Sequence, residues 1–403
     1  MASCKEFRIT KTDHVIFALL ACWCMVDSVN GLLLRSDFMS ISQIFKISVA
    51  FIVIKKCQGN KTFNNLLFGI IVYLSLYLFN IVLHGEEVAS SITLVSKLIT
   101  SILFYYYFLQ VLSADESYFE QKAYHVFKWN FLFFAANMLL GIMGFGYAAY
   151  GDAEDGIGSK GFFYAGNELS GVVAAVFPWV FFYIIKNYSN IIYFMSGIVL
   201  FVLVYTLSTK SGIFATFLLF LMTALFYGDK KIKIIISFSS IVLAFYIIIH
   251  IHSLLETEVA VIERFYYFLE RDGLMDAMTS GRLDHWGEES VVFFKSDILI
   301  WVFGLGGMRT VEMDPPDSLL NCGLIGFIAL MSFYIKGLAK PFKRRYKNNP
   351  YRLVVFYSNV ILVVISIVAG HILFSSMAGM LIALSNAMLL INKNNTYITP
   401  PNR

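Results

Sequence analysis

The sequence is dominated by apolar stretches that are long enough to cross a lipid bilayer. A transmembrane α-helix needs about 20 apolar residues, and stretches of this kind recur along most of the 403 residues. Apolar residues make up 58% of the chain and charged residues 14%, against roughly 45 to 50% and 25% in soluble domains. This pattern excludes an ordinary soluble domain and predicts an all-α, polytopic integral membrane protein.

About twelve transmembrane helices are predicted from these stretches. The sequence shows no internal repeat and no low-complexity tract, so residues 1–403 are expected to form a single membrane domain. The predicted spans cover residues 15–34, 38–54, 65–83, 92–112, 126–146, 166–185, 191–208, 211–227, 232–251, 317–335, 353–369 and 372–391.

Basic residues fall on alternate loops between the predicted spans. Lys and Arg concentrate in short cytoplasmic loops, and the loops on the other side, HGEEVASS and GDAEDGIGSKG, are acidic or mixed. Both termini are therefore expected in the cytoplasm. The basic clusters are Lys5, Arg8 and Lys11 before the first span, Lys55, Lys56 and Lys61 after the second, Lys230, Lys231 and Lys233 after the eighth, and KPFKRRYK after the tenth.

Net charge and cysteine content argue against two other kinds of protein. A formal net charge of +4 is too small to indicate nucleic-acid binding. The five cysteines are odd in number and lack the spacing of metal ligands. We therefore expect no nucleic-acid partner, no disulfide framework and no metal site.

One predicted external segment, 252–316, is about 65 residues long, far longer than a connector between two helices. We expect it to form a helical cap between the ninth and tenth spans. Two stretches within it, VAVIERFYYFLE and RLDHWGEESVVFFK, have apolar residues at helical spacing and predict amphipathic helices. The alternative is that these helices rest on the membrane interface and take no part in chemistry.

Two charges lie inside predicted spans, where each costs roughly 2.5 to 3.5 kcal/mol. Asp27 and Lys46 both lie about 10 to 13 Å from the outer turn near Arg35, counting about 1.5 Å per residue. One helical hairpin can therefore bring them face to face, either as a structural ion pair or as part of an ion pathway. Lys97 lies about one turn into its span, and its side chain is expected to reach the membrane surface.

Lys210 lies in TLSTKSG, a tight turn on the predicted outer side, where the positive-inside rule disfavours cations. It is either a rim residue without a function or part of an anion site. Its neighbours Ser208, Thr209, Ser211 and Gly212 supply hydroxyl and backbone N–H groups at a helix start, a setting that holds phosphate oxygens.

The predicted cap carries further cations. Arginine suits pyrophosphate because its planar guanidinium group donates two parallel hydrogen bonds. The cations are Arg264, Arg271, Arg282 and Arg309, with His285 nearby.

Acids gather in VEMDPPDSLL, at the end of the cap. Asp317 is well placed as the N-cap of the tenth span, and Pro315 and Pro316 suit the first turn of that helix. Glu312 has no comparable structural explanation. A carboxylate just outside a helix start, on the same side as several arginines, is a candidate general base, and Asp314 is the alternative base.

Several local patterns together resemble the bacterial O-antigen polymerase and ligase superfamily. GFFYAGNELSG opens a span, TLSTKSG joins two spans, SGRLDHW lies in the long external loop, and FGLGGM is followed by VEMDPPDSLLNCGLIGF. These patterns occupy residues 161–327, and the flanking spans match the superfamily only in number and hydropathy. The resemblance implies an enzyme of the bacterial inner membrane.

The resemblance also implies roles for individual residues. Lys210 stands where members often have an arginine, and Arg282 falls on the arginine that precedes the tryptophan, here Trp286. Glu312, or else Asp314, would accept the proton. The residues expected to bind pyrophosphate or glycan are Arg282, Lys210, Arg264, Arg309, His285, Asn167, Glu168 and His371.

Ligases of the superfamily typically carry a His-Asn pair just before the span that here begins at Asp317, whereas EMD in this chain resembles the polymerase branch. The resemblance thus implies a polymerase that joins undecaprenyl-pyrophosphate-linked oligosaccharide repeats at the outer face of the membrane. Cationic side chains would replace a metal ion, and no cofactor is expected. The further partners implied are membrane lipids, a chain-length regulator and a flippase. A ligase is the nearest alternative, and a polysaccharide or lipid-linked-glycan transporter is the alternative from another class.

Overall fold

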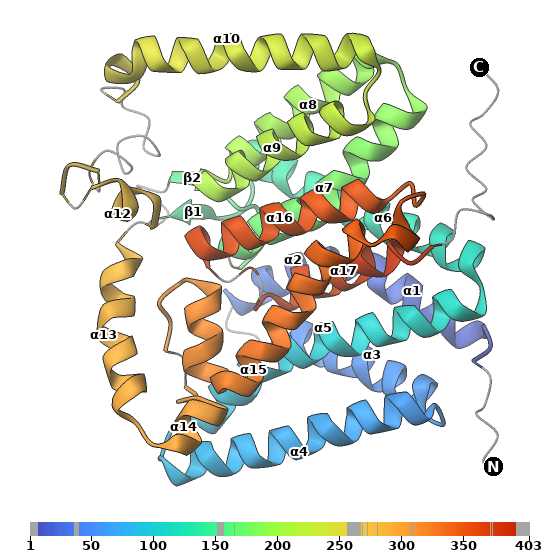
Figure 1. Ribbon diagram of the computed structural model, residues 1–403, viewed down its shortest axis with the longest axis vertical. Coiled ribbons are helices and arrows are strands. Elements are labelled where there is room, and N and C mark those ends of the chain that lie inside the picture. The colour runs from blue at the N-terminus through green and yellow to red at the C-terminus, as the bar shows by residue number, and fades with distance from the viewer. Residues whose placement is uncertain are drawn as a thin grey trace.

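Each predicted span coincides with a helix or a pair of helices in the computed structural model (Figure 1). The structure describes residues 7–35, 40–150, 157–164, 166–255, 267, 269–271, 273–279, 281–307, 309–370, 372 and 374–391. In chain order the elements are α1 (Lys11–Ala21), α2 (Trp23–Leu34), α3 (Ile41–Cys57), α4 (Lys61–Leu83), α5 (Val88–Ala114), α6 (Glu116–Ile142), β1 (Ala148–Tyr150), β2 (Ile157–Ser159), α7 (Gly166–Asn187), α8 (Asn190–Tyr205), α9 (Lys210–Tyr227), α10 (Lys230–Leu255), α12 (Leu274–Thr279), α13 (Arg282–Lys295), α14 (Ile298–Phe303), α15 (Asp314–Ala339), η1 (Lys340–Phe342), η2 (Arg344–Tyr346), α16 (Arg352–Ala369) and α17 (Ser376–Met388).

The chain is a multi-pass membrane protein, but in the part that the structure describes fewer than twelve helices are individually long and apolar enough to span a bilayer. Among the described residues, five helices meet that standard, and α1 with α2 makes a sixth if this pair, bent by 51°, is one span. Helices α8, α16 and α17 are apolar but shorter. The count of twelve therefore stays a prediction. The five helices are Lys61–Leu83, Val88–Ala114, Glu168–Asn187, Lys210–Tyr227 and Asp314–Phe342.

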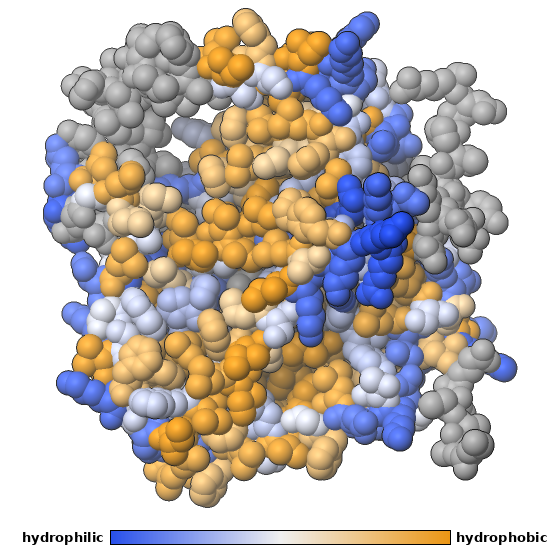
Figure 2. Space-filling view, viewed as in Figure 1, coloured by the Kyte–Doolittle hydropathy of each residue, from blue (hydrophilic) through white to orange (hydrophobic). Residues whose placement is uncertain are grey.

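Helices α7 and α17 form the centre of the bundle. α7 is largely buried and packs against α6, α9, α16 and α17. Every residue of α17 from Met377 to Met388 is buried. It crosses α5 so closely that a Cβ atom on Gly379 would overlap the Ser101 hydroxyl group. The outer helices expose apolar side chains instead, and these form a broad band across the molecule in Figure 2.

The small strands β1 and β2 and the helices α12, α13 and α14 gather at one end of the bundle, on the left of Figure 1. We call this end, which carries β1, β2, α12, α13 and α14, the cap end. Strands β1 and β2 pair in antiparallel fashion within a stretch that the sequence analysis treated as a plain loop. The backbone N–H of Ser159 donates to the Thr206 carbonyl, 2.6 Å away, and ties this hairpin to the end of α8.

The structure confirms one of the two amphipathic helices expected in the cap. RLDHWGEESVVFFK forms α13, which buries Phe293. Most of VAVIERFYYFLE lies outside the described residues.

Two glycines of the family-like patterns have a structural role. Gly323 breaks the helical geometry inside α15 with φ 61°, and Gly304 ends α14 with φ 93°. A Cβ atom on Gly323 would overlap the Val302 carbonyl group, and one on Gly304 would overlap the backbone of Asn321. The glycines of FGLGGM and NCGLIGF therefore allow α14 and α15 to pack backbone to backbone.

Candidate active site at the cap end

Arg282 and Glu312 form an ion pair at the cap end. The Nη2 and Nε atoms of Arg282, the first residue of α13, donate to Oε2 of Glu312 over 2.7 and 3.2 Å. Nη1 donates to the carbonyl groups of Val368, at 2.5 Å, and Thr279, at 3.3 Å. The Arg282 side chain is 14% exposed and that of Glu312 is 49% exposed. The sequence analysis singled out both residues, and the structure brings them together.

The backbone of Glu312 lies in the left-handed region, with φ 59°. Such a conformation costs a non-glycine residue on the order of 1 kcal/mol or more, and it persists only where the surroundings enforce it. The Thr310 hydroxyl accepts from the Glu312 N–H at 3.1 Å. Gly370 approaches the Glu312 carbonyl so closely that no Cβ atom would fit there. The Glu312 backbone is therefore held in this conformation by its surroundings.

The other two acids of VEMDPPDSLL are buried. Asp314 is 0% exposed, and its Oδ2 accepts from the Ile372 N–H at 2.8 Å. The expectation that Asp317 is the helix N-cap was wrong, because α15 begins at Asp314 with Met313 as its N-cap. Asp317 lies in the first turn, where its Oδ1 accepts from the Val311 N–H at 2.6 Å. Of the three acids, only Glu312 presents a solvent-accessible carboxylate.

The remaining cap cations have separate surroundings. Arg309 pairs with Glu289 of α13, at 3.2 Å, and with Glu86, at 3.5 Å, so it links α13 to the connection between α4 and α5. His285 lies on the exposed face of α13. Arg264, His371 and the side chain of Asn167 lie outside the described part of the structure.

Lys210 begins α9, and its ammonium nitrogen is shielded from solvent. The neighbouring hydroxyls contact α7. Ser211 Oγ donates to Ser170 Oγ at 3.0 Å, and Thr209 Oγ1 lies 3.3 Å from the same atom. These hydroxyls, which the sequence suggested as phosphate ligands, fasten the start of α9 to α7.

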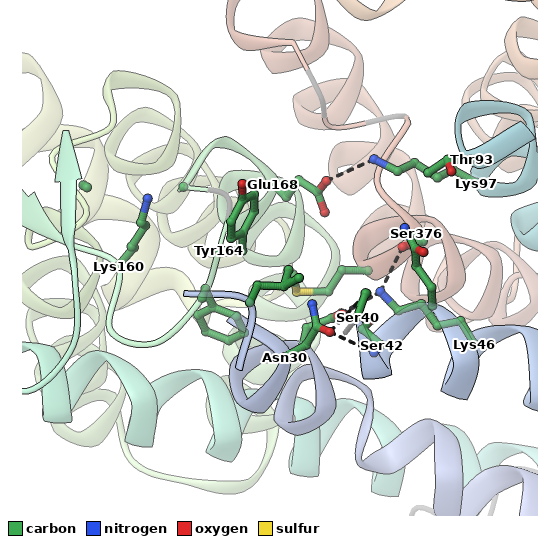
Figure 3. A pocket seen from close by; sticks show the side chains of 17 residues that line it. Asn30, Ser40, Ser42, Lys46, Thr93, Lys97, Lys160, Tyr164, Glu168 and Ser376 are labelled. Atoms are coloured by element: carbon green, nitrogen blue, oxygen red, sulfur yellow. Dashed lines mark hydrogen bonds and ion pairs between the residues drawn. The ribbon is translucent and has the colours of Figure 1, made fainter. Parts of the chain in front are cut away.

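A cavity of about 560 Å³ lies between α2, α3, α5 and the starts of α7 and α17 (Figure 3). Its lining includes a buried ion pair, in which Lys46 Nζ lies 2.6 and 2.9 Å from the carboxylate oxygens of Asp27. The pairing predicted from their equal depth is confirmed. Ser42 also donates to Asp27, and Lys46 donates to Ser376 Oγ at 2.9 Å. This closed set of contacts favours the structural ion pair over an ion pathway.

A second ion pair in the cavity joins Lys97 to Glu168 at 3.4 Å. Glu168 also accepts from Ser375 Oγ at 2.8 Å. Lys97 thus lines the cavity, whereas the sequence analysis expected it at the membrane surface. Lys160 is a further lining residue, 9% exposed, which the sequence analysis did not single out. The only feature of the sequence that points to Lys160 is its position among small residues in GIGSKG.

Four described residues from the end of α16 to the start of α17 contact the Arg282–Glu312 pair, the neighbouring Asp314 or the cavity. The Val368 carbonyl accepts from Arg282, and the Ile372 N–H donates to Asp314. Ser375 and Ser376 reach the two ion pairs of the cavity. These four residues therefore contact groups of both sites.

Comparison with known proteins places the chain in a family. The family described as O-antigen ligase like membrane protein matches residues 16–228, which extend from α1 to α9 and include the cavity lysines. Searches of the curated proteins and of the solved structures found no match. Since the match covers more than half of the 403 residues, the chain belongs to the O-antigen ligase like family of membrane proteins.

Proposed function

We propose that this protein is an O-antigen polymerase. Family membership indicates a membrane enzyme of surface polysaccharide biosynthesis that transfers glycosyl groups. The polymerase would act at the outer face of the bacterial inner membrane, with the cap end facing outward. It would transfer the growing glycan from undecaprenyl pyrophosphate to a hydroxyl of the next lipid-linked repeat unit.

The observation that supports this proposal is the Arg282–Glu312 pair, with its exposed carboxylate in an enforced backbone conformation. Glycosyl transfer from a pyrophosphate needs a cation for the leaving group and a base for the acceptor hydroxyl. In the resting protein the Arg282 guanidinium group and the Glu312 carboxylate form an ion pair with each other. When a donor pyrophosphate binds Arg282, the Glu312 carboxylate is released to act as the base.

The transfer step is a displacement. The acceptor oxygen attacks the anomeric carbon of the donor while its proton passes to Glu312. The bond from that carbon to the pyrophosphate oxygen breaks, and its electron pair leaves with the pyrophosphate, where Arg282 stabilises the negative charge.

Replacement of Arg282 tests the site. In purified protein supplied with lipid-linked repeats, Arg282→Ala should abolish elongation. Arg282→Lys should retain only part of the elongation activity, because an ammonium group cannot donate the two parallel hydrogen bonds of a planar guanidinium group. Lys295→Ala, at the exposed end of the same helix, is the matched control and should elongate normally. Normal elongation by Arg282→Ala would remove Arg282 from the reaction.

The glycan profile of a cell that lacks the protein separates polymerase from ligase. Loss of a polymerase leaves one repeat unit per anchor, whereas loss of a ligase leaves no attached glycan. A profile without attached glycan would overturn the polymerase assignment and favour the ligase.

A further inference from the structure

Lys160 is a buried cation without a counter-ion in the described part of the chain. The residue is 9% exposed, and no described group forms an ion pair or a hydrogen bond with its ammonium nitrogen. Burial, and next the positive charge of Arg35, lower the pKa of Lys160. An isolated charge held away from water is costly. Such a group is expected where an anion binds and offsets that cost.

The backbone around Lys160 is fixed firmly. Its N–H donates to the Tyr147 carbonyl at 3.0 Å, and its own carbonyl accepts from the Asn137 side chain of α6 at 3.1 Å. The next residue, Gly161, has φ 56° and fits against Asn137 without room for a Cβ atom. These backbone hydrogen bonds and the close contact of Gly161 therefore hold Lys160 at the wall of the cavity.

The charges of the cavity favour an anionic ligand. Among the described residues, its lining contains Lys46, Lys97 and Lys160 against Asp27 and Glu168, which leaves one positive charge in excess within this part of the lining. The two carboxylates are already paired with Lys46 and Lys97. In Figure 3, Lys160 lies on the opposite side of the cavity from these two lysines. The volume of about 560 Å³ is within the range of roughly 300 to 1,000 Å³ found for small-molecule sites.

The surroundings of the cavity favour a ligand with a lipid tail. On α3, Gln43 and Lys46 line the cavity, whereas the adjacent Ile44 and Ile47 are exposed on the apolar outer surface. The aromatic ring of Tyr164, 59% exposed, also lines the cavity and offers a surface for a sugar ring. A polar headgroup can thus enter the cavity while its tail remains in the bilayer.

We propose that this cavity binds the pyrophosphate of the lipid-linked acceptor, and that Lys160 is its principal cation. This assignment rests on the proposed polymerase function, in which two pyrophosphate-bearing lipids meet. Two separate cationic centres avoid the repulsion that both pyrophosphates would experience at one centre. Arg282, which contacts Val368, then serves the donor, and the cavity, whose Lys46 contacts Ser376, serves the acceptor.

Binding of farnesyl pyrophosphate to the full-length protein in lipid nanodiscs tests the proposal. Native mass spectrometry should find two bound molecules on the parental protein, and one on either Lys160→Met or Arg282→Ala. Affinity at the cavity should fall by about tenfold or more in Lys160→Met, the scale for losing a hydrogen bond to a charged group. Lys295→Met is the control and should bind two. Farnesol should bind neither site, because it lacks the pyrophosphate.

Thermal unfolding separates a binding role of Lys160 from a structural one. Without ligand, Lys160→Met should unfold at the same temperature as the parental protein or higher, because it removes an isolated buried charge. A lower unfolding temperature, with both farnesyl pyrophosphate molecules still bound, would overturn the proposal in favour of a structural lysine.

The remaining outcomes are also decisive. Undiminished binding of two molecules by Lys160→Met overturns the acceptor site and leaves the Arg282 site intact. Equal affinity of the cavity for inorganic pyrophosphate assigns it to free phosphates and overturns the lipid-linked acceptor. Normal binding and elongation by Arg282→Ala, in contrast, contradict the proposed function itself.

Discussion

Glu312, Asp314 and Asp317 are close in sequence, yet the structure gives each carboxylate a different environment. Asp314 and Asp317 are buried and accept backbone N–H groups from Ile372 and Val311. Glu312 is half exposed and faces a guanidinium group. A general base must be reachable by the acceptor hydroxyl, so accessibility distinguishes Glu312 from the other two.

At the residue scale, we therefore predict that Glu312→Gln lowers the rate of glycosyl transfer by roughly a hundredfold or more, the usual scale for losing a general base. Binding of the lipid-linked donor should change little, because the base contacts the acceptor. Single-turnover elongation and donor binding, both measured on purified protein, give the two quantities.

Asp314→Asn is the comparison variant, since asparagine retains an acceptor for the Ile372 N–H. We expect it to keep most of the transfer rate. If Glu312→Gln elongates at the parental rate and Asp314→Asn does not, then Asp314 is the base.

At the scale of elements, the apolar pattern predicted where helices form but not where they break. The break between α1 and α2 depends on α6, whose Asn130 accepts from the Cys24 N–H and donates to the Leu20 carbonyl, both at 2.9 Å. Nothing in the sequence near Cys22 signals that contact. Lys160 was missed for a similar reason, because the side chain that holds its backbone carbonyl, Asn137, is 23 residues earlier in the sequence. Arg282, Glu312 and Glu168 were found because they lie in recognisable local patterns.

The contacts of Asn130 at the break between α1 and α2 predict that Asn130→Leu lowers the free energy of unfolding. The substitution leaves a buried N–H and a buried carbonyl of the α1–α2 junction without the contacts that Asn130 supplies, and each unsatisfied group costs about 1 to 3 kcal/mol. We expect the free energy of unfolding of Asn130→Leu to be clearly lower than that of the parental protein, as measured by denaturant titration in detergent. Asn187→Leu, at the exposed end of α7, is the control and should change it little. Equal stability of the two variants would show that Asn130 does not hold the break.

A histidine joins α4 to α14 in a pH-dependent manner. Nδ1 of His84 lies 2.9 Å from the Asn80 carbonyl and Nε2 lies 2.8 Å from the Asp297 carboxylate, so both ring nitrogens face acceptors. These hydrogen bonds, led by that to Asn80, raise the pKa of His84. The contact is therefore fully stabilising below the ordinary histidine pKa of about 6.5, and is lost as pH rises through the raised value.

Hydrogen exchange checks this prediction. The amides of α14 should be better protected at about pH 6 than at about pH 8.5, beyond the intrinsic effect of pH on exchange, and His84→Gln should remove the difference. His125→Gln, a histidine exposed on α6, should leave it unchanged. A difference that persists in His84→Gln would assign the pH response to another group.

At the scale of the whole molecule, both proposed sites require the cap end to face outward. The charge pattern supports this orientation, because the basic segment after α15 lies a full helix length away from the cap end. Glu288 of α13 and Lys343 between η1 and η2 are both exposed, so each position is open to a reagent on its own side of the membrane.

In a cysteine-free variant of the protein, a single cysteine at position 288 should react with a membrane-impermeant maleimide added to intact cells whose outer membrane has been permeabilised. A cysteine at position 343 should react only after the inner membrane is lysed. Because donor and acceptor would both be presented at the outer leaflet, the opposite labelling pattern would place Arg282, Glu312 and Lys160 on the wrong side for either lipid. It would thus contradict the polymerase proposal even if every substitution above behaved as expected.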